Sequence, residues 1–324
     1  MKKILSLLCC LLAVLVMQAQ TVSFQFSSDS YVEARLRPVM QRNASELLSE
    51  IHAACKARRP LNLSNISMEK AAKEHLTSLW KVTRFELEEE SVVTDCVRDV
   101  EGYQARDILV NLHPVDKVTF RGQLARSLTL SFNKRGVITG ARFALPLHNI
   151  KQIMGEGDAV TDLAERRMLL KFVEDFLGYY NERNIEALRK VYSDDALIIT
   201  GSVVKKRVRN GDVTSVKTEI RYNQQTKDKY IESLKGIFNR NKEAFHVEFD
   251  KIEVVAHATQ KGYYGVKVHQ KWDTANYHDD GWVFLLWDFR NPDEPMVHVR
   301  TWQPYTVAEH EVFSLGDFRL PPSK

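Results

Sequence analysis

The chain has 324 residues, of which 46 are Lys or Arg and 42 are Asp or Glu, so its formal net charge is only +4 at pH 7. This near balance gives no sign of the strongly basic surface that is typical of nucleic-acid-binding proteins. The length exceeds that of a usual single domain and favours two.

Residues 1–19 have the pattern of a secretory signal peptide. Lys2 and Lys3 form a positive start, an apolar run covers residues 4–17, and Ala19 stands at a suitable cleavage point. We therefore expect a secreted or periplasmic protein. No other segment reaches the ~20 apolar residues of a membrane-spanning helix, so we expect no transmembrane segment in the mature chain.

Residues 30–150 are predicted to form a first domain. A helix begins near Pro38 and keeps apolar residues at three- and four-residue steps as far as Ala54, and a second helix covers 67–80. From residue 85 onward the apolar period changes to two. That period is typical of half-buried antiparallel strands.

A second domain is predicted over residues 161–305, after a linker at 151–160 and before a C-terminal tail at 306–324. Its first helix, over 161–181, carries an aromatic stripe, and Asn184 caps a short helix that follows. A hairpin, a further helix and five alternating strands complete the domain.

The two predicted domains share an internal repeat. The segment around His75 matches the one around Tyr230 at an offset of 155 residues, and the segment around Arg142 matches the one around Arg300 at an offset of 158. This small drift is what loop insertions between two copies of one structural unit would produce.

Three segments carry a resemblance to a known family. FVEDFLGYYNERNIEALRKVYSDDALIITG, at 172–201, resembles the start of the nuclear transport factor 2-like, or SnoaL-like, superfamily. GWVFLLWDF at 281–289 and MVHVRTWQP at 296–304 resemble its last two strands. The resemblance covers about residues 160–305. The first domain lacks the Asp-Asp-Ala signature and joins the family only as a divergent copy, through the repeat.

The resemblance implies an α+β fold in which a bent antiparallel sheet wraps around N-terminal helices. Such a domain forms a cone with a pocket at its wide end, and we expect two of these cones in tandem. The same scaffold hosts isomerases, dehydratases, binding modules and oligomerisation domains, so the resemblance fixes no chemistry.

Asp288 is the candidate catalytic residue because it follows an apolar run. A carboxylate in apolar surroundings has a raised pKa and could act as a general acid or base. With Tyr180 and His298 it would form a site of the ketosteroid isomerase or dehydratase type. Alternatively, Asp288 pairs with Arg290 or Arg300 and has no chemical role.

Strand 282–289 is apolar on both faces, so both faces must be covered. Helices would cover one face, and we expect the first domain or a second chain, in a homodimer, to cover the other. Aromatic residues near this strand, together with one arginine, are candidate ligand-binding residues, although the aromatic ones could equally belong to the core. These candidates are Tyr180, Tyr192, Trp272, Trp282, Trp287, Arg300 and Trp302.

A hairpin over 201–222 is basic in an otherwise balanced protein. Asn210-Gly211 between alternating residues predicts its turn, and its basic residues include Lys205, Lys206, Arg207 and Arg209. The hairpin could dock an anionic partner of the cell envelope. It could also be a solvated hairpin whose charges protect an edge of the sheet.

Neither cysteines nor histidines show a ligand pattern. Cys55 and Cys96 remain after leader removal, and they could form a disulfide or stay free. The ten histidines include no i, i+4 pair, so we expect no metal site. The chain has no nucleophile elbow, phosphate loop or dinucleotide motif, and we expect no cofactor.

The sequence therefore favours a secreted or periplasmic, non-catalytic binding or assembly module of the cell envelope. Its ligand would be an unknown protein or a small apolar molecule, and no nucleic acid is expected. The alternative is a small-molecule isomerase or dehydratase whose pocket lies in the second domain.

Overall fold

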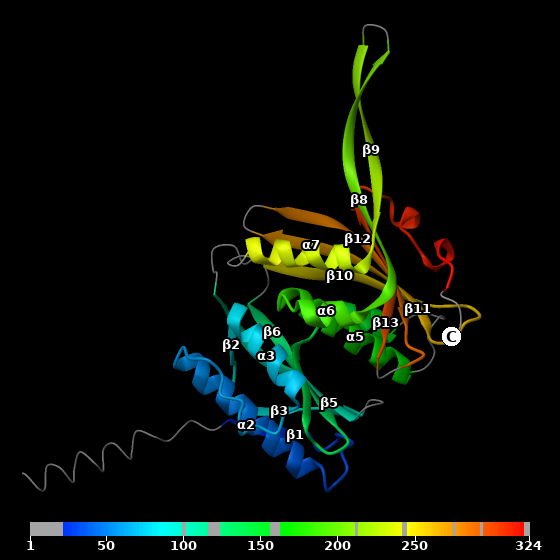
Figure 1. Cartoon of the computed structure of the whole chain (residues 1–324). Helices are drawn as coiled ribbons and strands as arrows, with labels where there is room; N and C mark the ends of the chain where they lie inside the picture. The colour runs from blue at the N-terminus through cyan, green and yellow to red at the C-terminus, as the bar shows by residue number, and fades with distance from the viewer. Residues whose placement is uncertain are drawn as a thin grey trace, which may run out of the picture. The chain divides into compact units, whose positions relative to one another are not determined.

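The computed structural model describes residues 22–98, 102–115, 124–155, 163–210, 213–241, 245–274, 277–291 and 294–320 (Figure 1). The predicted signal peptide lies outside these residues. The chain divides into two compact units. The first has the described residues up to Pro114 and Leu124–Ala144, and the second has Val115 and the described residues from Leu145 onward. Among the helices of the described part, none is both long enough and apolar enough to cross a membrane.

The first unit combines two helices with a bent antiparallel sheet whose order is β2-β5-β6-β7. β4 pairs with β5, and β1 pairs in parallel with β3. Its elements are β1 (Ser23–Phe26), α2 (Arg37–Lys56), α3 (Lys70–Val82), β2 (Thr83–Leu87), β3 (Ser91–Thr94), β4 (Cys96–Arg98), β5 (Gly102–Pro114), β6 (Ala125–Asn133) and β7 (Ile138–Phe143).

α2 forms as the apolar spacing predicts. Pro38 occupies its first turn, where the missing N–H costs nothing, and Met40, Leu47 and Ile51 are buried along one face. Asn43 on the same helix donates through Nδ2 to the Gly136 carbonyl at 2.8 Å. This bond ties the helix to the turn between β6 and β7.

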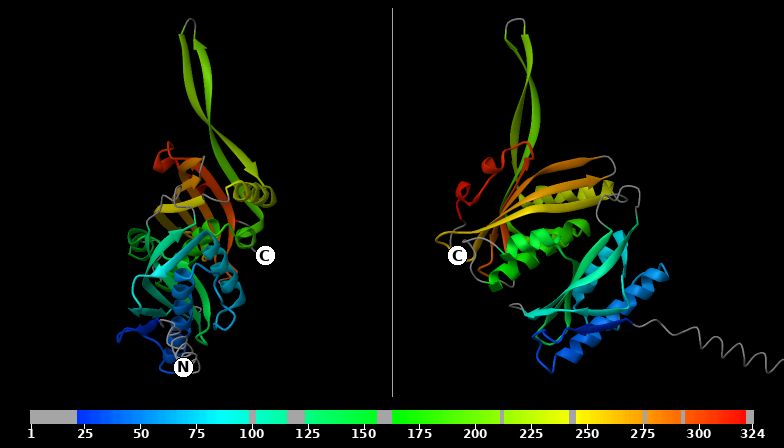
Figure 2. Two further views of the ribbon diagram at one scale, coloured as in Figure 1. Left: turned by 90° about the vertical axis from the view of Figure 1, so that its left-hand side faces the viewer. Right: turned by 180° about the vertical axis from the view of Figure 1, so that it is seen from behind.

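The second unit wraps a six-stranded sheet, in the order β10-β11-β12-β13-β8-β9, around helices (Figure 2). Only the β13–β8 pair is parallel. Its elements are α4 (Leu147–Gly155), α5 (Leu163–Asn181), α6 (Ile185–Val191), β8 (Tyr192–Asn210), β9 (Val213–Gln225), α7 (Lys227–Arg240), β10 (Phe245–Ala256), β11 (Tyr263–Thr274), β12 (His278–Asp288), β13 (Met296–Pro304) and 3-10 turns at Glu309–Glu311 and Leu315–Asp317.

The structure confirms the α+β class with bent antiparallel sheets around helices. Residues 151–155 of the expected linker form the end of α4, where Ile153 is buried; residues 156–160 lie outside the described part. Cys55 and Cys96 are both free thiols.

The topology supports the internal repeat. α3 precedes the strands β2, β5, β6 and β7, and α7 precedes β10, β11, β12 and β13, each set forming an antiparallel meander. In the second unit β8 runs parallel to the last strand of the meander. In the first unit a single parallel bridge, between Met68 and Ile138 of β7, takes that place.

Aromatic rings fill one end of the second unit. Phe172 and Phe176 of α5 pack edge-on against Trp287, with ring centroids 5.8 and 5.9 Å apart, and Phe289 lies 5.0 Å from Phe172. Edge-to-face pairs at these distances are favourable. The aromatic stripe on α5 is therefore core at this end of the cone.

The C-terminal tail covers the outer face of the sheet. Phe284 and Leu286 point away from the helices and pack against Phe313, Leu315 and Phe318, and the rings of Phe284 and Phe318 stack with centroids 5.6 Å apart. The tail thus supplies a cover for this face that the sequence did not lead us to expect. The apolar side chains of the tail lie close enough in sequence to fold back over the strand that precedes them.

Candidate functional site

A cavity of about 470 Å3 lies in the second unit between α7 and the inner face of the sheet. α7 and the residue after it contribute Tyr230, Leu234, Ile237, Arg240 and Asn241, and the strands and their connections contribute Thr200, Gly201, Gln270, Trp272, Thr274, Tyr277, Asp279, Arg300 and Trp302. Asp279 at this end of β12 is eight residues from Trp287, or about 25 Å along a strand. The cavity and the aromatic plug thus occupy opposite ends of the cone.

The alternation of side chains along β11 and β13 brings the residues that line the cavity to the same face of the sheet. Gln270, Trp272 and Thr274 are two residues apart on β11, and Arg300 and Trp302 are two apart on β13. Side chains two residues apart share a face of a sheet.

Arg300 is the charged floor of the cavity. Its side chain is buried, at 4% exposure, and its guanidinium carbon lies 5.0 Å from the centre of the Tyr230 ring. One terminal nitrogen donates to Gln270 Oε1 at 3.4 Å, while Nε has no hydrogen-bond partner among the described residues. No carboxylate of the described part forms an ion pair with it within 4.0 Å. A buried cation in this state is costly to the fold.

Three tyrosine hydroxyls stand behind the cavity wall. Tyr180 Oη lies 2.7 Å from that of Tyr230 and 3.1 Å from that of Tyr192. Burial raises the pKa of Tyr192 and Tyr230 well above the usual value, and Arg300 only partly offsets this. Burial would lower the pKa of Arg300, but the surrounding phenols raise it above its ordinary value. The cluster therefore presents a permanent cation among neutral phenols.

Asp279 is the acidic residue in the cavity lining. Burial raises its pKa, although hydrogen bonds from the Tyr277 hydroxyl and a backbone N–H, and the charge of Arg300, act in the opposite direction. Burial, together with Asp279, raises the pKa of Tyr277 to about 12. The cavity is thus lined by two cations, the buried Arg300 and the exposed Arg240, and by a carboxyl group that keeps its proton more readily than usual.

Asp288 does not reach this cavity. It is an odd number of residues from Asp279 on β12, so the two side chains lie on opposite faces. Burial alone would raise the pKa of Asp288, but hydrogen bonds from the Arg290 side chain and backbone and from His298 lower it overall. An ion pair with Arg290 at 2.8 Å holds the carboxylate. Pairing of Asp288 with Arg290 is the alternative to a catalytic role that the sequence analysis left open.

The structure separates the predicted catalytic trio. His298 Nε2 lies 3.2 Å from Asp288 Oδ2, whereas the Tyr180 hydroxyl bonds to the tyrosines on the inner face. His298 and Asp288 form a pair without the third member. Asp288 therefore lacks both the raised pKa and the neighbour expected of a general acid at this site.

The predicted binding residues fall into four places. Trp272, Arg300 and Trp302 line the cavity, whereas Tyr180 and Tyr192 lie buried behind Tyr230. Trp287 belongs to the plug. Trp282 lies on the outer face, where its ring stacks on Tyr305 at 5.7 Å.

The sequence did not single out Tyr230 and Asp279 as site residues. Tyr230 was visible as the counterpart of His75 in the repeat. Asp279 shares its strand face with Gly281 and Val283, and counting by twos from the buried Trp287 would have placed it inside.

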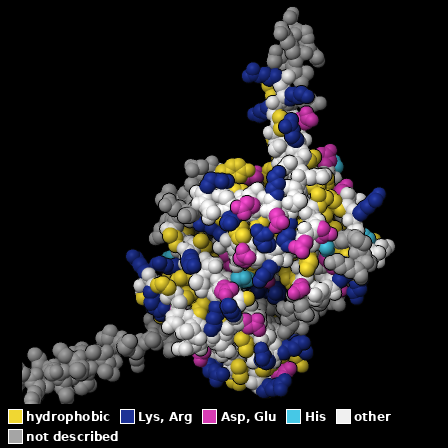
Figure 3. Space-filling view, in the orientation of Figure 1, with side chains coloured by type: hydrophobic (Ala, Val, Ile, Leu, Met, Phe, Trp, Pro, Cys, Tyr) yellow, Lys and Arg dark blue, Asp and Glu magenta, His cyan; other side chains and the backbone are white. Residues whose placement is uncertain are grey.

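The basic hairpin extends beyond the sheet. The last register pair between β13 and β8 is Trp302–Thr200, and from there β8 and β9 continue as a two-stranded ribbon that projects from the unit (Figure 1). Lys205, Lys206 and Arg207 are exposed, and Lys and Arg side chains follow the ribbon in Figure 3. The Arg209 side chain and Gly211 of the predicted turn lie outside the described part.

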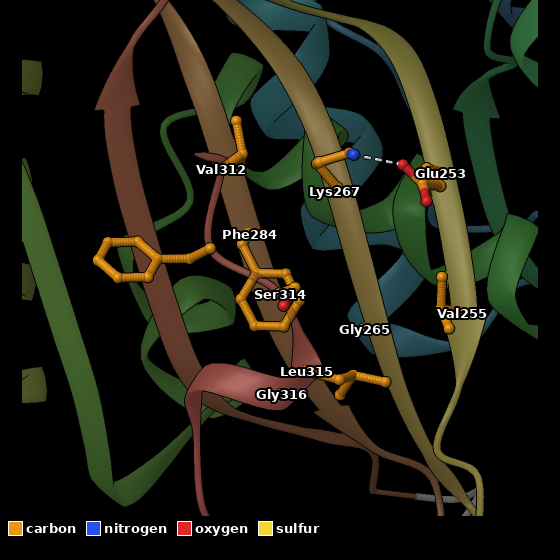
Figure 4. Close-up of a pocket in the computed structure, with 10 residues that line it drawn as sticks. Glu253, Val255, Gly265, Lys267, Phe284, Val312, Ser314, Leu315 and Gly316 are labelled. Atoms are coloured by element: carbon orange, nitrogen blue, oxygen red, sulfur yellow. Dashed lines mark ion pairs between the residues drawn. The ribbon is translucent and has the colours of Figure 1, made fainter. Parts of the chain in front are cut away.

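A second, smaller cavity lies on the outer face, between the tail and the sheet (Figure 4). Its volume is about 280 Å3, and an ion pair between Lys267 and Glu253 stands at its edge. Gly265 forms part of its floor. A larger residue would be too close to its neighbours at this position, because a Cβ there would come within 2.9 Å of the Phe284 ring. The tail residues Ser314 and Leu315 close the other side.

Known proteins resemble the chain through structure alone. No protein-family model and no curated protein matches it. A nuclear transport factor 2-like protein of unknown function from Shewanella oneidensis is 12% identical, with a TM-score of 0.31, over 43% of this chain and 98% of that one. A protein assigned provisionally as a scytalone dehydratase, from Novosphingobium aromaticivorans, is 12% identical, with a TM-score of 0.32, over 44% and 85%.

A further match is Bd1075 from Bdellovibrio bacteriovorus, which is 12% identical with a TM-score of 0.33. The match covers 52% of this chain and only 46% of Bd1075. The solved structures that match part of the chain thus include nuclear transport factor 2-like proteins. The likeness concerns the fold and carries no activity.

Proposed function

We propose that the protein is a secreted or periplasmic binding module of the cell envelope and that its second unit binds a small organic anion. The observation that supports this most is Arg300, a buried cation that lines the cavity and forms no ion pair within 4.0 Å with a described carboxylate, although Asp279 lines the same cavity. An anionic ligand would supply the missing charge, since buried charges are stable when paired and hydrogen-bonded.

The remaining walls suit an aromatic or alicyclic carboxylate. Trp272 and Trp302 offer flat apolar surface, and Leu234 and Ile237 of α7 close the opposite side. A volume of about 470 Å3 is within the range of small-molecule pockets. The ligand would place its carboxylate at Arg300 and its ring between α7 and the tryptophans.

The test is a paired binding screen. Benzoate, indole-3-acetate and cholate are titrated by calorimetry beside their uncharged amides, and the carboxylates should bind more tightly. Arg300→Met should remove this preference, because binding of the amides does not depend on the cation. Arg290→Met, which removes an arginine from the outer face, is the matched control. Equal affinity of acids and amides for the wild type would contradict the proposal.

A second candidate function, an isomerase or dehydratase, is favoured by Asp279. Its pKa is raised, it shares the cavity with Arg300, and Arg300 could stabilise an enolate while Asp279 moves a proton. Asp279→Asn should then abolish turnover of a bound 2-enone or β-hydroxy acid and leave its binding intact. Proton–deuterium exchange into the ligand, followed by NMR, measures this without a known product.

We further propose that the basic ribbon contacts an anionic envelope partner. Lys205, Lys206 and Arg207 are exposed on the part of β8 that extends beyond its last described pairing with β13. Reversal of these three charges to Glu should remove partners from pull-downs with envelope fractions. An unchanged partner set would exclude the ribbon as the binding surface.

Fractionation of cells that express the full chain tests the proposed secreted or periplasmic location. Light scattering tests whether the protein forms a homodimer.

A further inference from the structure

Three metal-binding side chains meet in the first unit, at the edge of its sheet. Cys55 lies in the last turn of α2, Glu86 in β2 and His113 in β5. One ligand atom from each lies within 4.8 Å of the other two. From the sequence we expected no metal site, because these three residues are far apart along the chain.

Folding explains the meeting. β2 is an edge strand that pairs with β5, with Arg84 opposite His113, so Glu86 is the diagonal neighbour of His113 on the same face. His113 Nε2 lies 3.0 Å from Glu86 Oε1. α2 packs against β2 and brings Cys55 to this pair.

We propose that Cys55, Glu86 and His113 bind a zinc ion. Sulfur, imidazole nitrogen and carboxylate oxygen are all common zinc ligands, and a thiolate disfavours Mg2+ and Ca2+, which prefer oxygen. Zinc bonds of about 2.0–2.3 Å place tetrahedral ligand atoms roughly 3.3–3.7 Å apart. Side-chain movements of about 1 Å would therefore close the present set around the ion.

The site would keep one open position. The side chains of His113 and Glu86 are 42% and 34% exposed, and Cys55 is half-buried. Water can therefore complete a four-coordinate ion. Two anionic ligands balance the charge of Zn2+, so binding leaves no net charge at the sheet edge.

Binding must displace the thiol proton. Burial raises the pKa of Cys55, Glu86 raises it further, and Arg84 acts in the opposite direction. Zinc binds the thiolate, so one proton leaves for each ion bound.

Zinc titration of the full chain, by calorimetry against Mg2+, tests the site. We expect one zinc ion per chain, bound with release of a proton. Cys55→Ser and His113→Ala should each weaken binding by on the order of 100-fold, since loss of an outer partner alone already costs about 10–100-fold. Cys96→Ala, at the other free cysteine, is the matched control and should bind zinc as the wild type does.

Two measurements separate the site from adventitious binding at surface histidines. Co2+ in place of zinc should give a sulfur-to-cobalt charge-transfer band in the near ultraviolet, absent in Cys55→Ser. Iodoacetamide should alkylate wild-type Cys55 about tenfold more slowly at a zinc concentration of ten times Kd, and at an unchanged rate with Mg2+. The alkylation needs no variant and so does not depend on a variant that folds. Zinc that binds equally to Cys55→Ser, or no protection of the thiol, would overturn the proposal.

Discussion

Glu182 should make the second unit less stable as pH rises through the neutral range. This carboxyl group follows α5 and is buried, and its Oε2 has no hydrogen-bond partner among the described residues. Burial and the nearby Asp175 raise the pKa of Glu182 from 4.5 to about 8, although a hydrogen bond from Asn184 acts in the opposite direction. The folded unit therefore keeps a proton that the unfolded chain releases.

The direction and size of the change in stability with pH follow from this difference in protonation between the folded and the unfolded chain. Between about pH 4.5 and pH 8 unfolding releases one proton, so the free energy of unfolding should fall by about 1.4 kcal/mol for each pH unit. The total loss is at most about 5 kcal/mol, a large share of the ~5–15 kcal/mol that stabilises a typical domain. Glu182→Gln resembles the protonated form at every pH. It should be the more stable protein at pH 8 and should match the wild type near pH 5.

Urea unfolding followed by tryptophan fluorescence, at intervals from pH 5 to pH 8, measures both free energies. The difference in the free energy of unfolding between variant and wild type removes the contributions of the other titrating groups, since both proteins share them. Glu186→Gln removes an exposed carboxylate from the neighbouring α6 and should leave the wild-type slope in place. If the difference between Glu182→Gln and wild type stays constant across this range, the proton is not retained on folding and the reasoning fails.

Two packing predictions address the walls of the second unit. A Cβ at position 281 would lie 2.4 Å from the Gln303 carbonyl and 2.7 Å from the Trp302 ring, so Gly281→Ala should part β12 from β13, lower stability by about 1–3 kcal/mol and weaken ligand binding. Calorimetry checks both, and a fully stable variant would contradict the close approach. Phe318→Ala removes the ring stacked on Phe284 and should cost about 2 kcal/mol without a change in the affinity of the inner cavity. Loss of ligand binding there would show that the tail does more than cover the outer face.

The regular parts of the fold could be predicted from sequence. Periodicity located α2 and the alternating strands, and the repeat predicted two copies of one unit. The tail could not be located in this way, because a segment that folds back over a sheet needs no period of its own. The apolar outer face of β12 showed that a cover was needed. It did not show that Phe313, Leu315 and Phe318 would supply it.

The residues of the site could be predicted from the sequence only in part. Arg300 was chosen for its place in the last strand, and it lines the cavity. Asp288 was chosen because its neighbours are apolar, but β12 is apolar on both faces, so apolar neighbours do not decide which face a carboxylate occupies. Strand parity decides it, and parity from Trp287 favours Asp279. The cavity itself depends on how α7 lies over the sheet, which no local pattern encodes.

The two copies indicate how the cavity acquired its chemistry. Arg142 in β7 is the repeat counterpart of Arg300 and is also buried, but Ser131 accepts a bond from it at 2.9 Å. Arg300 has side-chain hydrogen bonds to Gln270 Oε1, at 3.4 Å, and to the Tyr180 hydroxyl. Aromatic Tyr230 occupies the place that His75 has in the first copy. A buried arginine at this position therefore belongs to the scaffold of both units. What distinguishes the second unit is the aromatic surrounding of its arginine, and the anion binding that we propose depends on that surrounding.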